Sequence, residues 1–320
     1  MTMKQNAPER LSADRVPLSA LQPISKRASF VYMERCLVHR DSNAIVSMSE
    51  LGTVHLPAAS FGTLLLGPGT RITHQAMNLL SESGVVTCWV GEGAVRLYAS
   101  APSLSKSTKL LQEQARLVSN RLSRLTVARR MYGMRFPGED VSKATMQQLR
   151  GMEGARIRKE YREQAARTGV EWKGRHYDPS NWSSGDTVNR ALSTANSCLY
   201  GVIHSVVAAV GCSPGLGFVH TGHALAFVHD IADLYKVEVT IPAAFESASD
   251  GDSDLSSRVR RDVREHVHQG RILERAVDDI HFVLRGHKGG EQDEPDRDEV
   301  VLWDDEGGSV QAGVAYGDET

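Results

Sequence analysis

The sequence predicts an α+β protein, with an N-terminal β-strand domain that resembles a β-sandwich and a C-terminal all-α domain. Short apolar or alternating runs, bounded by Gly, Pro, Ser and Asn, fill residues 26–100, which is the pattern of strands. Residues 108–286 instead repeat their apolar residues at the 3.6-residue period of helices. Residues 101–107, which are rich in Ser, are the expected linker between the two domains.

The N-terminal domain is expected to contain several strands and one short helix. Strands are expected at residues 29–38, 44–48, 52–56, 61–66, 85–90 and 94–99. Thr73 can accept a hydrogen bond from the first turn of a helix, so it is the expected N-cap of a helix over 74–83.

The C-terminal domain is expected to surround one buried helix with amphipathic ones. Residues 108–136 are predicted to form a helix that ends at Pro137-Gly138, and residues 142–168 one that ends at Gly169. Residues 187–210 are strongly apolar and are expected to be the central buried helix. Further helices are expected at 239–247, 256–268 and 272–284.

The two ends of the chain have a different composition from its body. Residues 1–25 lack an apolar segment and are expected to be a disordered leader rather than a signal peptide. Residues 287–320 hold 11 acidic and 2 basic residues, a net charge of −9, and are expected to be disordered alone. Since the whole chain carries −2, the preceding residues carry +7, a balance compatible with nucleic-acid binding but also found in many other proteins.

Composition excludes several classes of protein. A hydrophobic content of 41% and a charged content of 24% are typical of globular proteins. No run of apolar residues is long enough for a membrane span. The four cysteines lie far apart among apolar neighbours, which indicates reduced core thiols in a cytoplasmic protein. No nucleotide-binding glycine motif occurs.

The stretch GFVHTGHALAFVHDIADLYK at 217–236 combines metal-binding residue types with apolar sequence. Asp230 and Asp233 are three residues apart and would share one face of a helix. Carboxylates on a core-facing helix need a partner or a cation, because burial of a bare charge is unfavourable. His220 precedes this helix in a glycine-rich turn. One imidazole with several carboxylates suits Mg2+ or Mn2+, whereas a solvated helix face is the simpler alternative.

A second candidate stretch, LRGMEGAR at 149–156, places Glu153 between Gly151 and Gly154 in a helical pattern. Glycine within a helix costs roughly 1 kcal/mol relative to alanine. Close approach of a ligand or another backbone would justify that cost. A tight helix–helix crossing beside an exposed Glu153 is the alternative.

These two stretches and GRHYDPSNWSSGDTVNRALSTANSCLYG occur in an order that closely resembles the CRISPR-associated integrase of the spacer-adaptation complex, in its type I-E form. GPGTRITHQA, CWVGEGAVRLYAS and SKSTKLLQEQARL extend the resemblance toward the N-terminus. The resemblance implies a metal-dependent DNA endonuclease that inserts short foreign DNA into a repeat array by attack of a DNA 3′-hydroxyl on a phosphodiester. It also implies a homodimer that binds double-stranded DNA and joins a small ferredoxin-like partner in a larger complex.

In that family one Glu, one His and one Asp bind the metal. The matching positions here are Glu153, His220 and Asp230, with Asp233 as an accessory carboxylate. Replacement of any of the three ligands by Ala is expected to abolish the metal-dependent chemistry and leave the fold intact. Tyr200 matches a tyrosine near the family's active site, where it would position substrate, although a core role is equally open.

The resemblance also implies contacts with DNA. Arg71 and Arg96 match basic positions that contact DNA in the family, and Lys236 lies close enough to the metal to meet the same phosphates. Three arginines spaced three apart would form a basic face on the helix over 256–268, or simply a solvated one: Arg258, Arg261 and Arg264.

Some features leave other possibilities open. Arg35, His223 and His229 depart from the type I-E pattern, which puts in doubt how the DNA end is held. His220-x-x-His223 also permits a phosphohydrolase with a histidine-rich metal site, and a non-catalytic DNA-binding scaffold is a third possibility. Within the acidic tail, the apolar run 300–303 is expected to add a strand to the partner protein's sheet or to fold back on its own domain.

Overall fold

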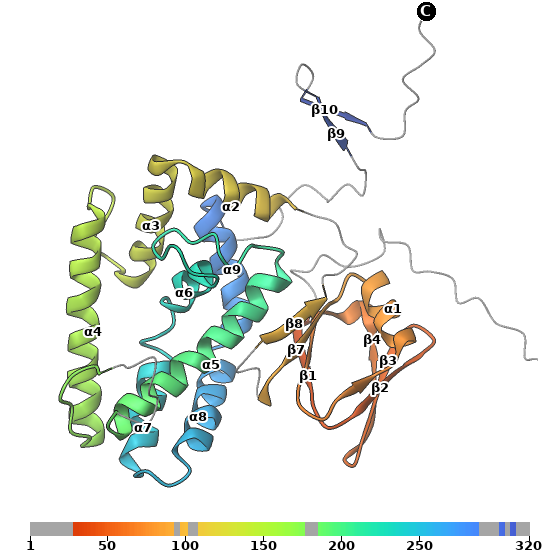
Figure 1. The fold of residues 1–320 in the computed structure, drawn as a ribbon, viewed down its shortest axis with the longest axis horizontal. Helices are drawn as coiled ribbons and strands as arrows, with labels where there is room; N and C mark the ends of the chain where they lie inside the picture. Colours follow the sequence, from red (N-terminus) through yellow and green to blue (C-terminus); the bar gives the residue numbers. More distant parts are fainter. Residues whose placement is uncertain are drawn as a thin grey trace, which may run out of the picture.

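The computed structural model describes residues 28–92, 97–101, 108–176, 185–287, 301–304 and 308–311. The strands of the first part lie together on one side of the molecule, and the helices of the second part lie on the other (Figure 1). The architecture is therefore α+β, with strands first and helices second, as the change of apolar period predicts.

Two four-stranded sheets make up the strand-rich part. The first has the order β1 (Ala28–Met33), β5 (Phe61–Leu66), β7 (Val86–Val90) and β8 (Leu97–Ala101). The second has the order β4 (Gly52–Pro57), β3 (Ala44–Ser49), β2 (Leu37–Asp41) and β6 (Arg71–Ile72). Residues of both sheets share one apolar core with helix α1 (His74–Glu82). Thr73 caps α1 by accepting a hydrogen bond from the Ala76 amide, as predicted.

The strand predicted over 29–38 is two strands that belong to different sheets. Strand β1 pairs in parallel with β5, whereas β2 pairs antiparallel with β3. Between them Arg35 adopts φ 50°, in the left-handed region, and its amide donates to the Pro68 carbonyl at 2.9 Å. Both halves are apolar, so the local sequence gives no sign of this turn.

Eight helices follow within the described residues. Their bounds are α2 (Lys109–Ser119), α3 (Arg121–Arg135), α4 (Met146–Thr168), α5 (Thr187–Ala209), α6 (Ala226–Ala232), α7 (Thr240–Ser249), α8 (Leu255–Gln269) and α9 (Ile272–Arg285). The single helix predicted over 108–136 is in fact two, because Asn120 has an extended backbone (φ −108°, ψ 128°). Its side chain caps α3 by accepting hydrogen bonds from two amides of the next turn.

Helix α5 is the buried centre of the helical part, as its apolar sequence predicts. Helices α6, α7, α8 and α9 pack around it. Apolar side chains of the first sheet, including Leu65 and Val86, belong to the same core, so strands and helices are joined by continuous packing. All four cysteines are free and buried. None of the helices in the described ranges combines the length and apolar character needed to span a lipid bilayer.

The acidic tail contains a hairpin. Strands β9 (Val301–Asp304) and β10 (Gly308–Gln311) pair antiparallel, with Leu302 opposite Val310. Most of the apolar run that was expected to join a partner's sheet is therefore already paired on one edge with its own chain.

Candidate metal centre

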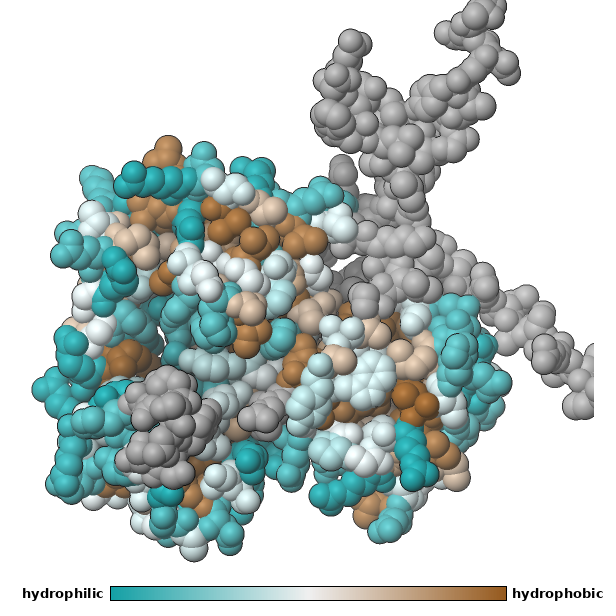
Figure 2. Space-filling model, in the orientation of Figure 1, coloured by the Kyte–Doolittle hydropathy of each residue, from teal (hydrophilic) through white to brown (hydrophobic). Residues whose placement is uncertain are grey.

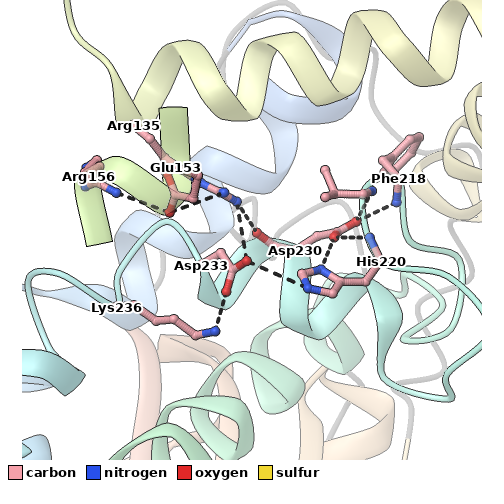
Figure 3. A network of polar contacts seen from close by, with 9 residues as sticks. Arg135, Glu153, Arg156, Phe218, His220, Asp230, Asp233 and Lys236 are labelled. Atoms are coloured by element: carbon pink, nitrogen blue, oxygen red, sulfur yellow. Dashed lines mark hydrogen bonds and ion pairs between the residues drawn. The ribbon is translucent and has the colours of Figure 1, made fainter. Parts of the chain in front are cut away.

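Asp230 holds the loop that precedes α6. Its buried carboxylate accepts hydrogen bonds from the backbone amides of Phe218, Val219 and His220, and from Nδ1 of the His220 ring at 2.7 Å (Figure 3). A carboxylate offers about four lone-pair directions, and these four donors fill them. The geometry therefore favours a structural role for Asp230 over the role of metal ligand that the sequence suggested.

The same loop is held from two other directions. The Arg124 guanidinium donates to the carbonyl oxygens of Gly217 and Phe218 at 3.0 and 2.8 Å. Gly217 itself permits the close turn, because a Cβ there would lie 2.6 Å from the His220 carbonyl oxygen and 2.8 Å from the Ala226 carbonyl carbon. The loop is thus built to fix the position of His220.

The hydrogen bond to Asp230 orients the His220 ring. An ionised carboxylate can only accept, so Nδ1 carries the proton and Nε2 is left for another partner. Nε2 lies 3.9 Å from Oδ2 of Asp233. The hydrogen bond from His220 to Asp230 raises the pKa of the imidazole, and burial opposes that shift. Proteins commonly orient metal-binding histidines through a carboxylate in this way.

Asp233 is an ionised carboxylate beside that free nitrogen. Its side chain is 15% exposed, and its Oδ1 lies 2.6 Å from Nζ of Lys236. Burial alone would raise the pKa of Asp233, but the charges of Lys236 and Arg135 hold it below its usual value. Asp233 therefore keeps a negative charge that can attract a cation. Asp230, in contrast, has no free lone pair for one.

Glu153 approaches the same centre from α4. Its Oε1 lies 3.5 Å from Arg156 Nη1 and 3.7 Å from Arg135 Nη1, while its Oε2 is buried and has no hydrogen-bond partner among the described residues. Burial raises the pKa of Glu153, although both arginines oppose that shift. A buried carboxylate oxygen without a donor is unfavourable, and a bound cation would supply the missing partner.

These observations fit a divalent cation held by Glu153, His220 and Asp233. Oxygen and imidazole donors suit Mg2+ or Mn2+. Within the described residues, however, no three His, Cys, Asp or Glu side chains stand close enough together to coordinate one ion as they are. His220 and Asp233 are neighbours, and Glu153 is connected to them through Arg135.

The other two histidines of the stretch stack on each other. The rings of His223 and His229 are 5.0 Å apart and 23° from parallel, and the Tyr200 ring lies 4.5 Å from His229. Burial, together with the charges of His220 and His223, lowers the pKa of His229 to about 4. Lys236 lies over the Tyr200 ring at 5.4 Å. Tyr200 therefore lies beside the candidate centre. The sequence alone had left a role at the site and a role in the core equally open.

The basic residues that were expected to contact DNA differ in where the structure places them. Lys236 belongs to the centre itself, and Arg71 is exposed on β6. Arg261 and Arg264 are exposed on α8, but Arg258 turns inward and donates to the carbonyl oxygens of residues 247 and 251. Arg258 is therefore not part of an exposed basic face, and Arg96 lies outside the described residues.

Sequence reasoning missed Arg135, at the end of α3. Its side chain is only 1% exposed, and it lies between Glu153 and Asp233. A basic residue on an amphipathic helix ordinarily faces solvent, so its spacing gave no signal of this position.

Comparisons with known proteins identify the family. A family model described as CRISPR associated protein Cas1 matches residues 138–254, which include all the candidate metal ligands. CRISPR-associated endonuclease Cas1 of Clostridium sp. strain SY8519 is 49% identical over 299 residues, 92% of this chain and 98% of the relative. CRISPR-associated endonuclease Cas1 2 of Thermus thermophilus is 43% identical over 90% of each chain.

A solved structure agrees with the sequence comparisons. The crystal structure of a TtCas1–DNA complex is similar to this fold with a TM-score of 0.77 and 43% identity, and the match covers 83% of this chain and all of the other. The alignments with these relatives cover far more of the chain than residues 138–254, which the family model matches. The chain therefore belongs to the Cas1 family of CRISPR-associated endonucleases.

Proposed function

We propose that this protein is the metal-dependent nuclease that inserts short DNA fragments into a CRISPR repeat array. Two relatives that align with about nine-tenths of the chain are named CRISPR-associated endonucleases, and one structural relative is a complex with DNA. The single observation that carries the mechanism is the buried, unpaired Oε2 of Glu153 at the centre that also holds His220 and Asp233.

A divalent ion bound by Glu153, His220 and Asp233 would supply Lewis-acid activation of a phosphodiester and of the attacking hydroxyl. The chain's own residues prepare the site. In the neutral ring, the hydrogen bond to Asp230 holds the His220 proton on Nδ1, so Nε2 is the nitrogen that faces a cation. Lys236, between Asp233 and the Tyr200 ring, is placed to contact a phosphate oxygen of the DNA. Direct attack by a DNA 3′-hydroxyl requires no covalent protein intermediate.

The outer face of α4 supports binding of DNA beside Glu153. A Cβ at Gly151 would meet nothing within 4 Å, and one at Gly154 would meet only the Arg158 side chain. In the described residues these glycines therefore do not serve a helix–helix crossing, which was the alternative explanation. The glycines leave room for the phosphate backbone of DNA to approach the helix. That backbone would be attracted by three exposed arginines of the same helix, Arg150, Arg158 and Arg162.

Two protein partners are also proposed, a small ferredoxin-like protein and a second copy of this chain. The motifs resemble the type I-E form, whose members act with a small ferredoxin-like protein. A homodimer is supported by apolar surface over the N-terminal sheets (Figure 2). Leu37 and Met48 face each other across β2 and β3 and are 42% and 47% exposed, and Leu51 at the adjoining turn is fully exposed. The buried free cysteines suit the cytoplasm.

The alternative of a histidine-rich phosphohydrolase is less well supported. His223 and His229 stack face to face instead of converging with His220 on one point. Replacement of His223 should therefore spare metal-dependent DNA chemistry. A non-catalytic scaffold would bind DNA equally well after the metal ligands are replaced. It would give no integration product with or without metal.

An integration assay tests the proposal. Purified protein, its small partner and supercoiled repeat DNA are combined with and without Mn2+. Glu153→Gln, His220→Ala and Asp233→Asn should each abolish strand transfer. Glu163→Gln is the matched control, because Glu163 is an exposed residue of the same helix whose ion pair in the structure is with Lys159. Strand transfer at the wild-type rate by Glu153→Gln would refute the assignment of the centre.

A further inference from the structure

Arg135 is buried between the two carboxylates of the candidate centre without hydrogen bonding to either. Its Nη1 lies 3.7 Å from Oε1 of Glu153, and its Nη2 lies 4.0 Å from Oδ2 of Asp233 (Figure 3). Nη2 donates one hydrogen bond, to the Asp230 carbonyl oxygen at 3.3 Å. Three elements, α3, α4 and α6, thus meet at one guanidinium.

This environment differs from that of arginines with a purely structural role. Arg124 and Arg130 each donate to two carbonyl oxygens of a loop or a helix end. Within the part of the chain that the structure describes, Arg135 has a single carbonyl partner and its buried Nε has none, and its Cζ lies 4.9 Å from the centre of the Tyr132 ring. Burial of a guanidinium is unfavourable unless it is compensated. The main compensation here is the negative charge of Glu153 and Asp233.

The two carboxylates in turn need that charge. Two negative charges at close range repel each other, and a cation placed between them offsets that repulsion. The Arg135 guanidinium lies between Glu153 and Asp233 and is placed to do so. Arg135 donates no hydrogen bond to either group, so it occupies none of their lone pairs.

We propose that Arg135 is a built-in counter-charge of the metal centre. It holds the carboxylates of Glu153 and Asp233 close together when no divalent ion is present. It also weakens binding of the ion, because both cations interact with the same two carboxylates. This makes Arg135 a positioning residue that sets the metal affinity, and the inference rests on the metal centre proposed above.

The coupling between Arg135 and the ion is reciprocal. Arg135→Gln removes the charge and keeps a donor for the Asp230 carbonyl. Without metal this variant should unfold at a lower temperature than the wild type. It should bind Mn2+ about tenfold more tightly, within the usual range of coupling between sites, and Mn2+ should raise its melting temperature more than that of the wild type. Arg135→Lys keeps the charge and should restore the wild-type affinity.

Mn2+ affinity is measured by electron paramagnetic resonance of the free ion, and melting temperature by calorimetry, both without DNA. Arg130→Gln is the matched control: it lies on the same helix and loses hydrogen bonds to the carbonyls of residues 283 and 284. It should lower the melting temperature and leave Mn2+ affinity unchanged, since the described contacts of Arg130 involve carbonyl oxygens and no metal ligand.

Mn2+ affinity in Arg135→Gln equal to or weaker than that of the wild type would overturn the proposal, and so would an Arg135→Lys variant that behaves like Arg135→Gln. If Arg135→Gln is insoluble, excess Mn2+ during purification should recover soluble protein, and failure to do so would count against the counter-charge. Absence of Mn2+ binding by the wild type would overturn the metal centre itself, whereas normal wild-type binding with an unresponsive variant would overturn only the role of Arg135.

Discussion

Asp230 and Asp233 are one helical turn apart, yet the structure predicts opposite consequences for their removal. Asp230→Ala deletes the acceptor of three backbone amides and of the His220 ring. Asp233→Asn keeps an oxygen beside Lys236 and removes only the charge. We therefore expect the first change to act on folding and the second to act on metal binding. This revises the expectation from sequence that Asp230→Ala would leave the fold intact.

The magnitude follows from the donors left without a partner. A buried donor that loses its acceptor costs about 1–3 kcal/mol. The hydrogen bond from the Phe218 amide is buried, whereas those from Val219 and His220 are partly buried. Asp230→Ala should therefore lower the free energy of unfolding by about 3–5 kcal/mol, a large part of the usual 5–15 kcal/mol. Loss of the Asp233 charge leaves the mostly buried Lys236 without its ionic partner and should cost about 2 kcal/mol.

Urea unfolding without metal measures both values, and Mn2+ titration of the folded variants measures the second effect. Asp233→Asn should unfold at a urea concentration between those of the wild type and Asp230→Ala, and it should fail to bind Mn2+. Asp230→Ala should unfold at a much lower urea concentration with an unchanged slope. A wild-type midpoint for Asp230→Ala would show that its four hydrogen bonds do not hold the loop, and Asp230 would again be a candidate metal ligand.

Three further outcomes test other parts of the structure. Gly217→Ala should destabilise by about 2 kcal/mol, because its Cβ would overlap the His220 carbonyl oxygen; an unchanged melting temperature would show that the loop adapts freely. Arg258→Ala should lose about 1–2 kcal/mol of stability and leave the salt dependence of DNA binding unchanged, whereas Arg264→Ala should reduce that dependence; the reverse result would place Arg258 on DNA. Burial lowers the pKa of His204 below 6.5, so its contribution to stability is present above that pH and is lost as the pH falls through the folded pKa. His204→Gln should make urea stability less sensitive to acid, and an equally steep loss would exclude His204 as the cause.

Much of the fold was predictable because the relevant signals are local. The apolar residues of 187–210 predicted the central helix, and α5 occupies 187–209 with most of its face buried. Thr73 predicted the start of α1 because an N-cap acts within one turn. The change from a period of two to one of 3.6 predicted strands before helices. The breaks at Arg35 and Asn120 were missed, since each interrupts a run whose apolar pattern continues on both sides.

The candidate centre could be predicted only in part. Sequence brought Glu153, His220 and both aspartates to attention, because carboxylates and histidines in apolar stretches need partners. It could not say which aspartate has free lone pairs, since that depends on amides of a loop 10 to 12 residues away that fold back onto Asp230. Nor could it place Arg135, because a charge 18 residues before Glu153 enters the site only when α3, α4 and α6 pack together. Residue types and their local spacing set the chemistry that is available, whereas the tertiary structure alone decided which groups meet and which lone pairs remain free.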